Sequence, residues 1–145
     1  MKLTGKERIA RSKICLPLDN LYSFEEIKAC IEELSPVVGL FKIGKELFTR
    51  FGPDVVKLVH EYDSEVFLDL KFHDIPNTVA KAVASAIRLD VQMLTIHTSG
   101  GLPMMVAAQK EAIDRAAELD HRPPLVLGVT VLTSMAGGDL KRVGS

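Results

Sequence analysis

Five apolar segments of strand length alternate with segments of helical spacing, and this alternation constrains the fold more than any other feature of the chain. The apolar segments span residues 13–18, 37–43, 66–72, 91–96 and 125–132. Strands that alternate with helices pair in parallel through right-handed crossovers. Strands that are apolar almost throughout are typical of a parallel sheet with both faces covered. The chain is therefore predicted to be an α/β protein built on a parallel sheet.

Apolar residues three or four positions apart predict helices over residues 24–34, 45–51, 54–62, 76–89 and 102–119. Local signals mark two of the helix starts. Ser23 with Glu26 three residues later forms a capping-box pattern. Pro76 suits a first helical turn, and Asp74 stands at or just before the cap position of the same helix. Residues 135–145 are expected to form a short helix or a loop.

Two architectures accommodate this order, an open doubly wound sheet and a (β/α)8 barrel. A dinucleotide-binding sheet has a glycine-rich turn after its first strand, where this chain has Leu18, Asp19 and Asn20. Polar side chains stand at the end of every predicted strand, namely Asp19, Lys42, Asp69 with Lys71, His97 and Thr133. Barrel enzymes assemble their active sites at the carboxyl ends of their strands, so the barrel is favoured.

A complete barrel needs about 200 residues or more, and this chain has 145. The expected fold is therefore a TIM (β/α)8 barrel of which about the first five βα units are present. Since no linker, repeat or low-complexity segment divides the chain, residues 1–145 are predicted to form one domain, the N-terminal portion of that barrel. Pro17 lies within the first strand and predicts an edge-like end, because proline has no N–H to donate.

Composition and charge exclude several classes of function. The net charge of −1 gives no electrostatic basis for binding nucleic acid or an anionic membrane. No apolar run approaches the ~18 residues of a membrane-spanning helix, and residues 1–13 lack the apolar core of a secretory signal. Cys15 and Cys30, like the four histidines, lack metal-ligand spacing. A cytoplasmic protein with free thiols and no metal is expected.

Two opposite charges stand near the end of the third apolar segment. Asp69 and Lys71 are two residues apart, so on a strand their side chains point to the same face. Taking an ion out of water costs several kcal/mol, so a strand core rarely accepts such a pair. Asp74 follows on the turn after the strand. We therefore interpret this stretch as a functional site, the alternative being a structural ion pair and a helix cap.

The surrounding residues resemble a known family. Residues 68–78 read Leu-Asp-Leu-Lys-Phe-His-Asp-Ile-Pro-Asn-Thr, which resembles the signature of the orotidine 5′-phosphate decarboxylase family. Shorter matches follow in the family's order: Leu-Asp at 18–19, Phe-Lys-Ile-Gly at 41–44, His-Thr-Ser-Gly-Gly at 97–101 and Val-Leu-Thr-Ser at 131–134. The resemblance covers essentially the whole chain. The core pattern Asp-x-Lys-x-x-Asp is also found in sugar-phosphate decarboxylases and synthases of the same superfamily.

The resemblance implies an activity and roles for individual residues. The family decarboxylates orotidine 5′-monophosphate to UMP, in pyrimidine biosynthesis, without metal or organic cofactor. Lys71 would donate a proton to C6 of the pyrimidine, and Asp69 would lie beside the departing carboxylate. Lys42 would hold Asp69 and the ribose, and Asp19 would bind a ribose hydroxyl. Thr133 or Ser134 would contact the pyrimidine.

The resemblance also implies a homodimer of barrels with its active sites at the interface. Asp74 and Thr78 would then reach into the partner's site, with Ile75 between them among the substrate-binding residues. His73 and His97 are expected to pack rather than to catalyse.

Three hypotheses remain open from the sequence. In the first, the chain represents the N-terminal part of a decarboxylase, because the family grips the substrate phosphate with residues of its last two strands. In the second, it is a non-catalytic partial barrel completed by oligomerisation or by a second polypeptide. In the third, it is a Mg²⁺-dependent sugar-phosphate lyase of the same superfamily. The third is disfavoured, because that chemistry calls for an acidic ligand where Lys42 stands.

Overall fold

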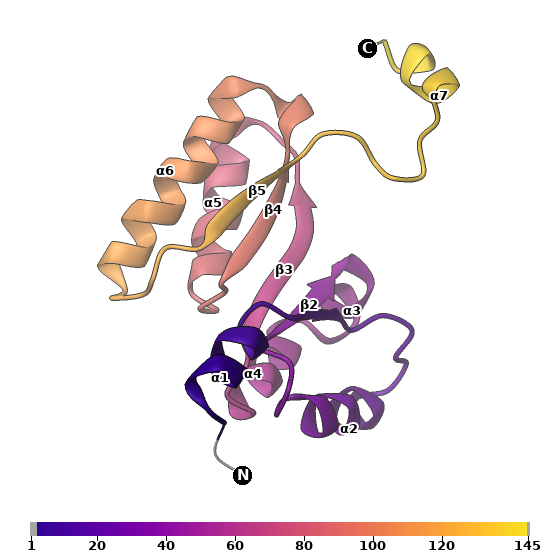
Figure 1. Ribbon diagram of the computed structural model, residues 1–145. Helices are drawn as coiled ribbons and strands as arrows, with labels where there is room; N and C mark the ends of the chain where they lie inside the picture. Colours follow the sequence, from indigo (N-terminus) through magenta and orange to yellow (C-terminus); the bar gives the residue numbers. More distant parts are fainter. Residues whose placement is uncertain (1–2, 145) are drawn as a thin grey trace.

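A single sheet of five parallel strands forms the centre of the computed structural model, which describes residues 3–144. The strands are β1 (Cys15–Pro17), β2 (Leu40–Gly44), β3 (Glu65–Phe72), β4 (Met93–His97) and β5 (Leu125–Val129). Neighbouring strands pair in parallel in the order β1-β2-β3-β4-β5 (Figure 1). Each strand is added on the same side of the one before it, whereas a doubly wound sheet reverses direction at a switch point. The prediction of about five βα units of a barrel is confirmed.

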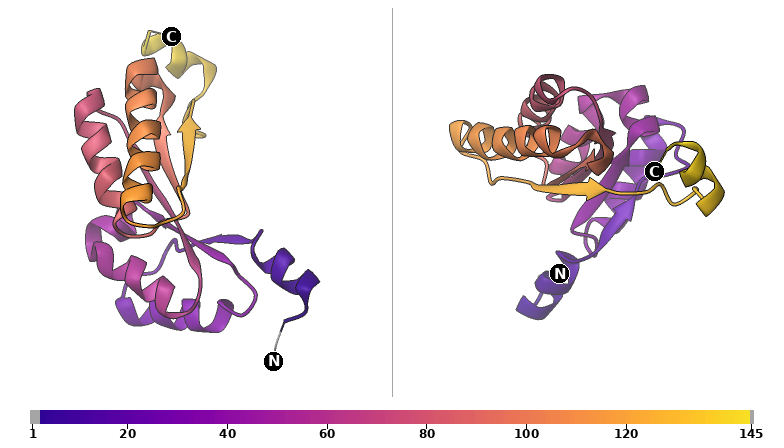
Figure 2. Two further views of the ribbon diagram at one scale, coloured as in Figure 1. Left: turned by 90° about the vertical axis from the view of Figure 1, so that its left-hand side faces the viewer. Right: turned by 90° about the horizontal axis from the view of Figure 1, so that it is seen from above.

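Helices precede, connect and follow these strands. They are α1 (Gly5–Arg11), α2 (Phe24–Leu34), α3 (Lys45–Phe51), α4 (Pro53–Glu61), α5 (Pro76–Ile87), α6 (Leu102–Glu118) and α7 (Gly137–Arg142), with a 3₁₀ turn at Thr98–Gly100. The predicted bounds of α2 and α3 are confirmed to the residue. The Ser23 hydroxyl accepts a hydrogen bond from the Glu26 N–H, and the Glu26 carboxylate accepts one from the Ser23 N–H, so the predicted capping box is present. α7 lies apart from the body of the sheet (Figure 2).

Helix α1 was not predicted from the sequence. It buries no residue, so it lacks the apolar periodicity on which the prediction of helices depended. Its start nevertheless carries a capping box between Thr4 and Glu7, which is a sequence signal. The Arg11 guanidinium, at its end, donates hydrogen bonds to the carbonyls of Ser35 and Asp63, which fixes α1 beside the amino ends of the strands.

Several strands are shorter than predicted. The second was expected to begin at Val37, but the N–H groups of Val37 and Val38 both bond to the Leu34 carbonyl and so complete the turn after α2. The fifth was expected to reach Leu132, but β5 ends at Val129. Apolar composition extends beyond the ladder because turn residues beside a core are also apolar. Pro17 lies in β1, an edge strand among the described residues, as its lack of an N–H predicted.

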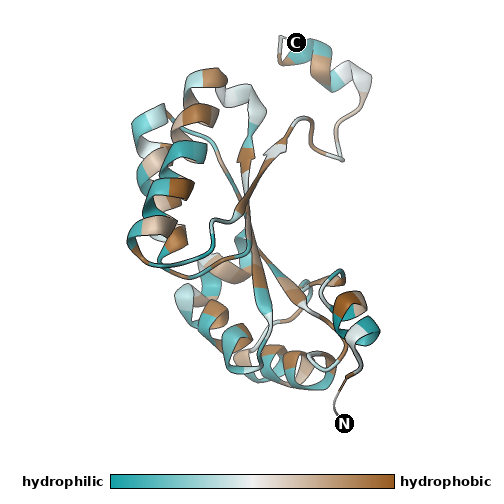
Figure 3. Cartoon of the chain, turned by 60° about the vertical axis from the view of Figure 1, so that its left-hand side comes forward, coloured by the Kyte–Doolittle hydropathy of each residue, from teal (hydrophilic) through white to brown (hydrophobic). Residues whose placement is uncertain are grey.

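The hydrophobic core lies between the sheet and helices α2 to α6. Phe41 and Ile43 of β2, Leu68 of β3 and Leu94 of β4 are 0–1% exposed on the face toward these helices. Figure 3 shows hydrophobic residues along the strands and mixed colouring on the helices, as amphipathic helices on a sheet require.

The other face of the sheet differs from the prediction that both faces are covered. On β5, Leu125 is 58% and Leu127 37% exposed. In a barrel, strands on the opposite side of the barrel cover this inner face.

None of the described helices is long and apolar enough to cross a membrane.

Candidate active site

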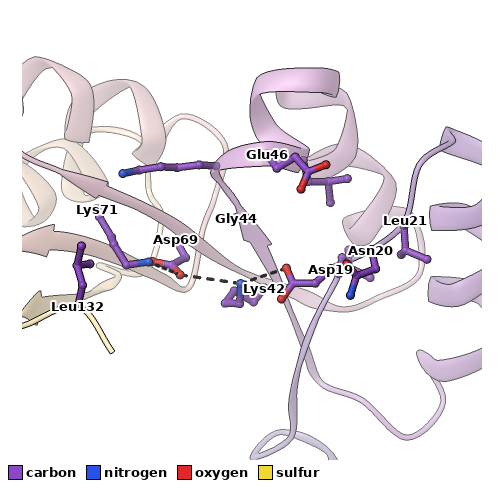
Figure 4. Close-up of a pocket in the computed structure, with 12 residues that line it drawn as sticks. Asp19, Asn20, Leu21, Lys42, Gly44, Glu46, Asp69, Lys71 and Leu132 are labelled. Carbon is purple, nitrogen blue, oxygen red and sulfur yellow. Dashed lines mark hydrogen bonds and ion pairs between the residues drawn. The ribbon is translucent and has the colours of Figure 1, made fainter. Parts of the chain in front are cut away.

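A cavity of about 310 Å³ opens at the carboxyl ends of β1, β2 and β3. Four of the predicted site residues line it: Asp19, Lys42, Asp69 and Lys71 (Figure 4). Asp19 follows β1, Lys42 lies in β2, and Asp69 and Lys71 lie in β3, so three parallel strands bring the four charges to one edge. That edge is where barrel enzymes place their active sites.

The four charges alternate in sign along a continuous network. The Asp19 Oδ1 to Lys42 Nζ distance is 3.5 Å, and the Lys42 Nζ to Asp69 Oδ2 distance is 3.9 Å. The Lys71 ammonium lies 2.8 Å from both carboxylate oxygens of Asp69. Since each carboxylate neighbours an ammonium, four ions share a small volume without excess charge. The predicted pairing of Asp69 with Lys71 is confirmed as a contact.

The register between β2 and β3 explains how Lys42 reaches Asp69. Gly44 pairs with Asp69, and Lys42 pairs with Phe67 two residues earlier. The Lys42 ammonium lies over Gly44, 3.5 Å from the place that a Cβ there would occupy. The side chain of Lys42 therefore extends along the sheet toward the end of β3.

Lys71 has a backbone conformation that strand alternation does not predict. Its φ is +51°, in the left-handed region, and the β3–β4 register shifts between Leu68 and Phe72. A bulge with a strained residue is a recurrent feature beside active sites. The Lys71 N–H donates a 2.8 Å hydrogen bond to the Thr95 hydroxyl, and that hydroxyl donates one of 2.8 Å to Asp69 Oδ1.

Asp69 is held in its ionised form. Burial by itself raises the pKa of this carboxyl, but hydrogen bonds from Lys71 and Thr95, with the charges of Lys71 and Lys42, outweigh it and lower the pKa below its ordinary value. Asp69 therefore stabilises the folded chain above its unfolded pKa of about 3.9. That contribution is lost as the pH falls through the lower pKa of the folded state.

Asp69→Asn is expected to reduce the dependence of the free energy of unfolding on pH in this acid range, because the variant has no carboxylate to protonate. Urea unfolding followed by circular dichroism between pH 7 and the acid limit of folding measures it. Asp54→Asn is the matched control, since Asp54 pairs with Lys57 on the surface at 3.1 Å with both side chains exposed. Equal pH dependence in Asp69→Asn and the unsubstituted chain contradicts the expectation.

The other predicted site residues do not line this cavity. Asp74, Ile75 and Thr78 are exposed at the start of α5. Ile75 is the N-cap, and the Asp74 Oδ1 accepts a 2.6 Å hydrogen bond from the Ile75 N–H, so Asp74 precedes the cap. Thr133 and Ser134 are exposed after β5. Their predicted roles as ligands stay predictions.

The two histidines near the motif contact each other. The ring centroids of His73 and His97 are 5.4 Å apart. Burial, and then electrostatic interactions with His73, Lys45 and Lys71, lower the pKa of His97, which favours its neutral form. His97 is half-buried but His73 is exposed, so the predicted packing role of the two rings stays a prediction.

Sequence reasoning missed several residues of the site. Asn20, Lys45, Glu46 and Leu132 also line the cavity. Thr95 does not line it, but its hydroxyl donates a hydrogen bond to Asp69. The available signal for Thr95 was a hydroxyl within the apolar segment 91–96, two residues before His97 and so on the same face. Among the described residues, no group of three or more His, Cys, Asp or Glu side chains is arranged to hold a metal ion.

Comparisons with known proteins agree with this geometry. Residues 12–144 match the Orotidine 5′-phosphate decarboxylase / HUMPS family. The chain is 48% identical over 135 residues to an orotidine 5′-phosphate decarboxylase from Syntrophotalea carbinolica, covering 93% of this chain and 55% of the relative. It is 53% identical over 114 residues to one from Shewanella sediminis, covering 79% of this chain and 47% of the relative. The chain thus spans about half the length of the curated relatives it matches.

Two solved structures share the fold. A conserved protein from Geobacillus kaustophilus, described as uncharacterized, superposes with a TM-score of 0.81 at 33% identity, covering 88% of this chain and 59% of that one. The orotidine 5′-phosphate decarboxylase of Lactobacillus acidophilus superposes with a TM-score of 0.79 at 33% identity, covering 90% of this chain and 58% of that one. With a family match over nearly its whole length and the charged network at the strand ends, the chain belongs to the orotidine 5′-phosphate decarboxylase / HUMPS family.

Proposed function

We propose that this chain carries the reacting lysine of an enzyme that decarboxylates orotidine 5′-monophosphate to UMP in pyrimidine biosynthesis, in the cytoplasm. One observation carries the proposal, the alternating network of Asp19, Lys42, Asp69 and Lys71 in a cavity at the ends of three parallel strands. The names of the curated relatives support the choice of reaction.

The proposed chemistry is a replacement of CO₂ by a proton at C6 of the pyrimidine. The bond between C6 and the carboxylate carbon breaks, and its electron pair stays on C6. The Lys71 ammonium neutralises this developing charge and then transfers a proton from Nζ to C6. A fixed cation placed where negative charge develops is among the largest contributions to catalysis. Because Lys71 supplies both the charge and the proton, the step uses neither metal nor cofactor.

Asp69 and Lys42 position the reacting lysine in this proposal. The Asp69 carboxylate binds the Lys71 ammonium through both oxygens at 2.8 Å, and Lys42 lies on its other side at 3.9 Å. These contacts on both oxygens of Asp69 fix the place of the Lys71 ammonium in the cavity. Lys42 and Asp19, at the open end of the network, are assigned to the ribose hydroxyls. Thr133 or Ser134 is assigned to the pyrimidine, since Leu132 beside them lines the cavity.

A homodimer is part of the proposal. Asp74, Ile75 and Thr78 are exposed and outside the cavity of their own chain, so they are available to a partner's site. Ile75 is 65% exposed, so its apolar side chain is available for a contact across such an interface.

A non-catalytic partial barrel is the second candidate, and the uncovered inner face of β5 favours it. Leu125 and Leu127 on that face would be covered by another copy or by a second polypeptide. The mass of the chain in solution distinguishes this candidate, because a stable monomer counts against completion by self-association. A Mg²⁺-dependent lyase is not proposed. That chemistry needs a second acidic ligand near Asp69, and the position beside Asp69 is occupied by the Lys42 ammonium at 3.9 Å.

The function is tested by comparing this chain with a chimera that continues it, after residue 144, with the remaining part of the Syntrophotalea carbinolica relative. The absorbance difference between substrate and product reports turnover directly. We expect negligible turnover from the 145-residue chain and ready turnover from the chimera, because energy from binding the remote phosphate supports the reaction at C6. A folded chimera without turnover refutes the decarboxylase proposal, and brisk turnover by the short chain refutes the need for the rest of the barrel.

A further inference from the structure

We propose that Thr95 is a positioning residue that couples the left-handed backbone of Lys71 to the ionised carboxylate of Asp69. Its role rests on the proposed function, in which Lys71 delivers the proton. Thr95 does not line the cavity, so it acts through the other two residues rather than on the substrate. The proposal is carried by the bulge in β3, the direction of two hydrogen bonds and the burial of the hydroxyl.

The bulge opens a gap in the ladder between β3 and β4. Leu68 pairs with Leu94, and the next pair is Phe72 with Ile96. From one pair to the next, β3 advances four residues while β4 advances two, so β3 has two more residues than β4 in this interval. Lys71 lies in this interval with its φ of +51°. A buried N–H without a partner is costly, so its amide needs another acceptor.

Thr95 supplies that acceptor from the opposite strand. The Lys71 N–H can only donate, so at 2.8 Å the Thr95 oxygen accepts. The hydroxyl proton is then free to point elsewhere, and Asp69 Oδ1 lies 2.8 Å away. An ionised carboxylate can only accept, which fixes the direction of the second bond. The Lys71 amide therefore donates to the Thr95 hydroxyl, and that hydroxyl donates to the Asp69 carboxylate.

Burial makes this connection rigid. Thr95 is 4% exposed and lies in β4, between β3 and β5 in the sheet. Water has little access to replace the hydroxyl as a partner of either group. A non-glycine residue in the left-handed region is strained, and the bond from the Lys71 amide to Thr95 offsets part of that strain.

The coupling through Thr95 fixes the position of the Lys71 ammonium. The left-handed φ of Lys71 sets the direction in which its side chain leaves the strand, and the ammonium ends 2.8 Å from both oxygens of Asp69. Without the hydroxyl, the Lys71 backbone loses the acceptor that holds this conformation, and Asp69 loses one donor. Both ends of the Lys71–Asp69 pair are thus fixed by the same hydroxyl.

Two variants of the 145-residue chain test the coupling without an activity assay. Thr95→Val keeps the shape and removes the hydroxyl, whereas Thr95→Ser keeps the hydroxyl. In Thr95→Val, hydrogen exchange of the Lys71 amide measured by NMR is expected to accelerate about tenfold or more. The pKa of the Asp69 carboxyl, measured from the pH dependence of its carbon chemical shift, is expected to rise, because the carboxylate loses a hydrogen-bond donor. Thr95→Ser is expected to match the unsubstituted chain in both measurements, and unchanged values in Thr95→Val overturn the proposal.

The unsubstituted chain provides a test that does not depend on a variant that folds. If Thr95 links the two groups, the Lys71 amide shift and the Asp69 carboxyl shift change with pH at the same midpoint. Separate midpoints, or an amide shift that does not respond, overturn the proposal.

Turnover by the chimera separates this inference from the proposed function. Thr95→Val is expected to lower kcat at least about tenfold with KM changed less than about threefold, because the hydroxyl does not touch the substrate. Thr95→Ser should restore kcat, and an unchanged kcat in Thr95→Val contradicts a positioning role. If the decarboxylase proposal fails, the chimera is inactive with Thr95 intact, while the exchange and titration results still decide the coupling.

Discussion

Lys71→Ala in the chimera is expected to lower decarboxylation by at least about 10³-fold while nucleotide binding stays measurable. The variant removes the only group assigned to neutralise charge at C6 and to protonate it. Binding survives because Lys42 and Asp19, which are assigned to the ribose, remain in place 3.5 Å from each other. Absorbance reports turnover, and calorimetric titration with UMP reports binding.

Two further variants define what Lys71 contributes. Lys71→Arg keeps a positive charge but holds its proton too tightly to give it up, so it is expected to bind nucleotide and remain inactive. Lys57→Ala is the matched control, because that lysine lies on the surface of α4 with its side chain 68% exposed. Retained turnover in Lys71→Ala removes this residue from its proposed role, and substantial turnover in Lys71→Arg assigns the residue to charge alone.

Phe41→Ala is expected to lower the free energy of unfolding of the chain by about 3–5 kcal/mol. Phe41 is 0% exposed in β2, on the face that packs against the helices, and it belongs to the continuous core. Truncating it removes apolar contacts and leaves a cavity that a packed strand cannot close. Because a domain is stable by only about 5–15 kcal/mol, this loss is a large fraction of the total.

Urea unfolding of the 145-residue chain, followed by circular dichroism, measures the effect. Ile9→Ala is the matched control, since Ile9 is 60% exposed on α1, a helix with no buried residue. The control is expected to change the free energy of unfolding by less than about 0.5 kcal/mol. A loss below about 1 kcal/mol in Phe41→Ala shows that the core tolerates the cavity and contradicts the expectation.

Elements with a strong local signal were predicted well. α2 begins at a capping box and carries its apolar residues at helical spacing, so its bounds follow from residues within one turn of each end. The bounds of the strands were predicted less well. A strand ends where its ladder ends, and the partner residues of β2 lie in β3, more than 20 residues further along the chain.

Some residues of the site could be predicted from the sequence and others could not. The charges of Asp69 and Lys71 stand out within an apolar segment, so their sequence positions mark them. Thr95 does not stand out, because a threonine is common in strands. Its importance depends on lying opposite a bulge, and nothing in residues 91–96 indicates a bulge in another strand.

The alternation of strands and helices and the identity of the charged residues follow from the sequence, because periodicity and residue type are local properties. Three features emerge only in the folded chain. They are the direction in which the strands are added, the approach of Asp19, Lys42 and Asp69 at one edge, and the left-handed turn at Lys71. These features depend on the register between strands that are distant in the chain. A shift of two residues in β3 relative to β4 brings the Thr95 hydroxyl to the Lys71 amide, and no local pattern encodes that shift.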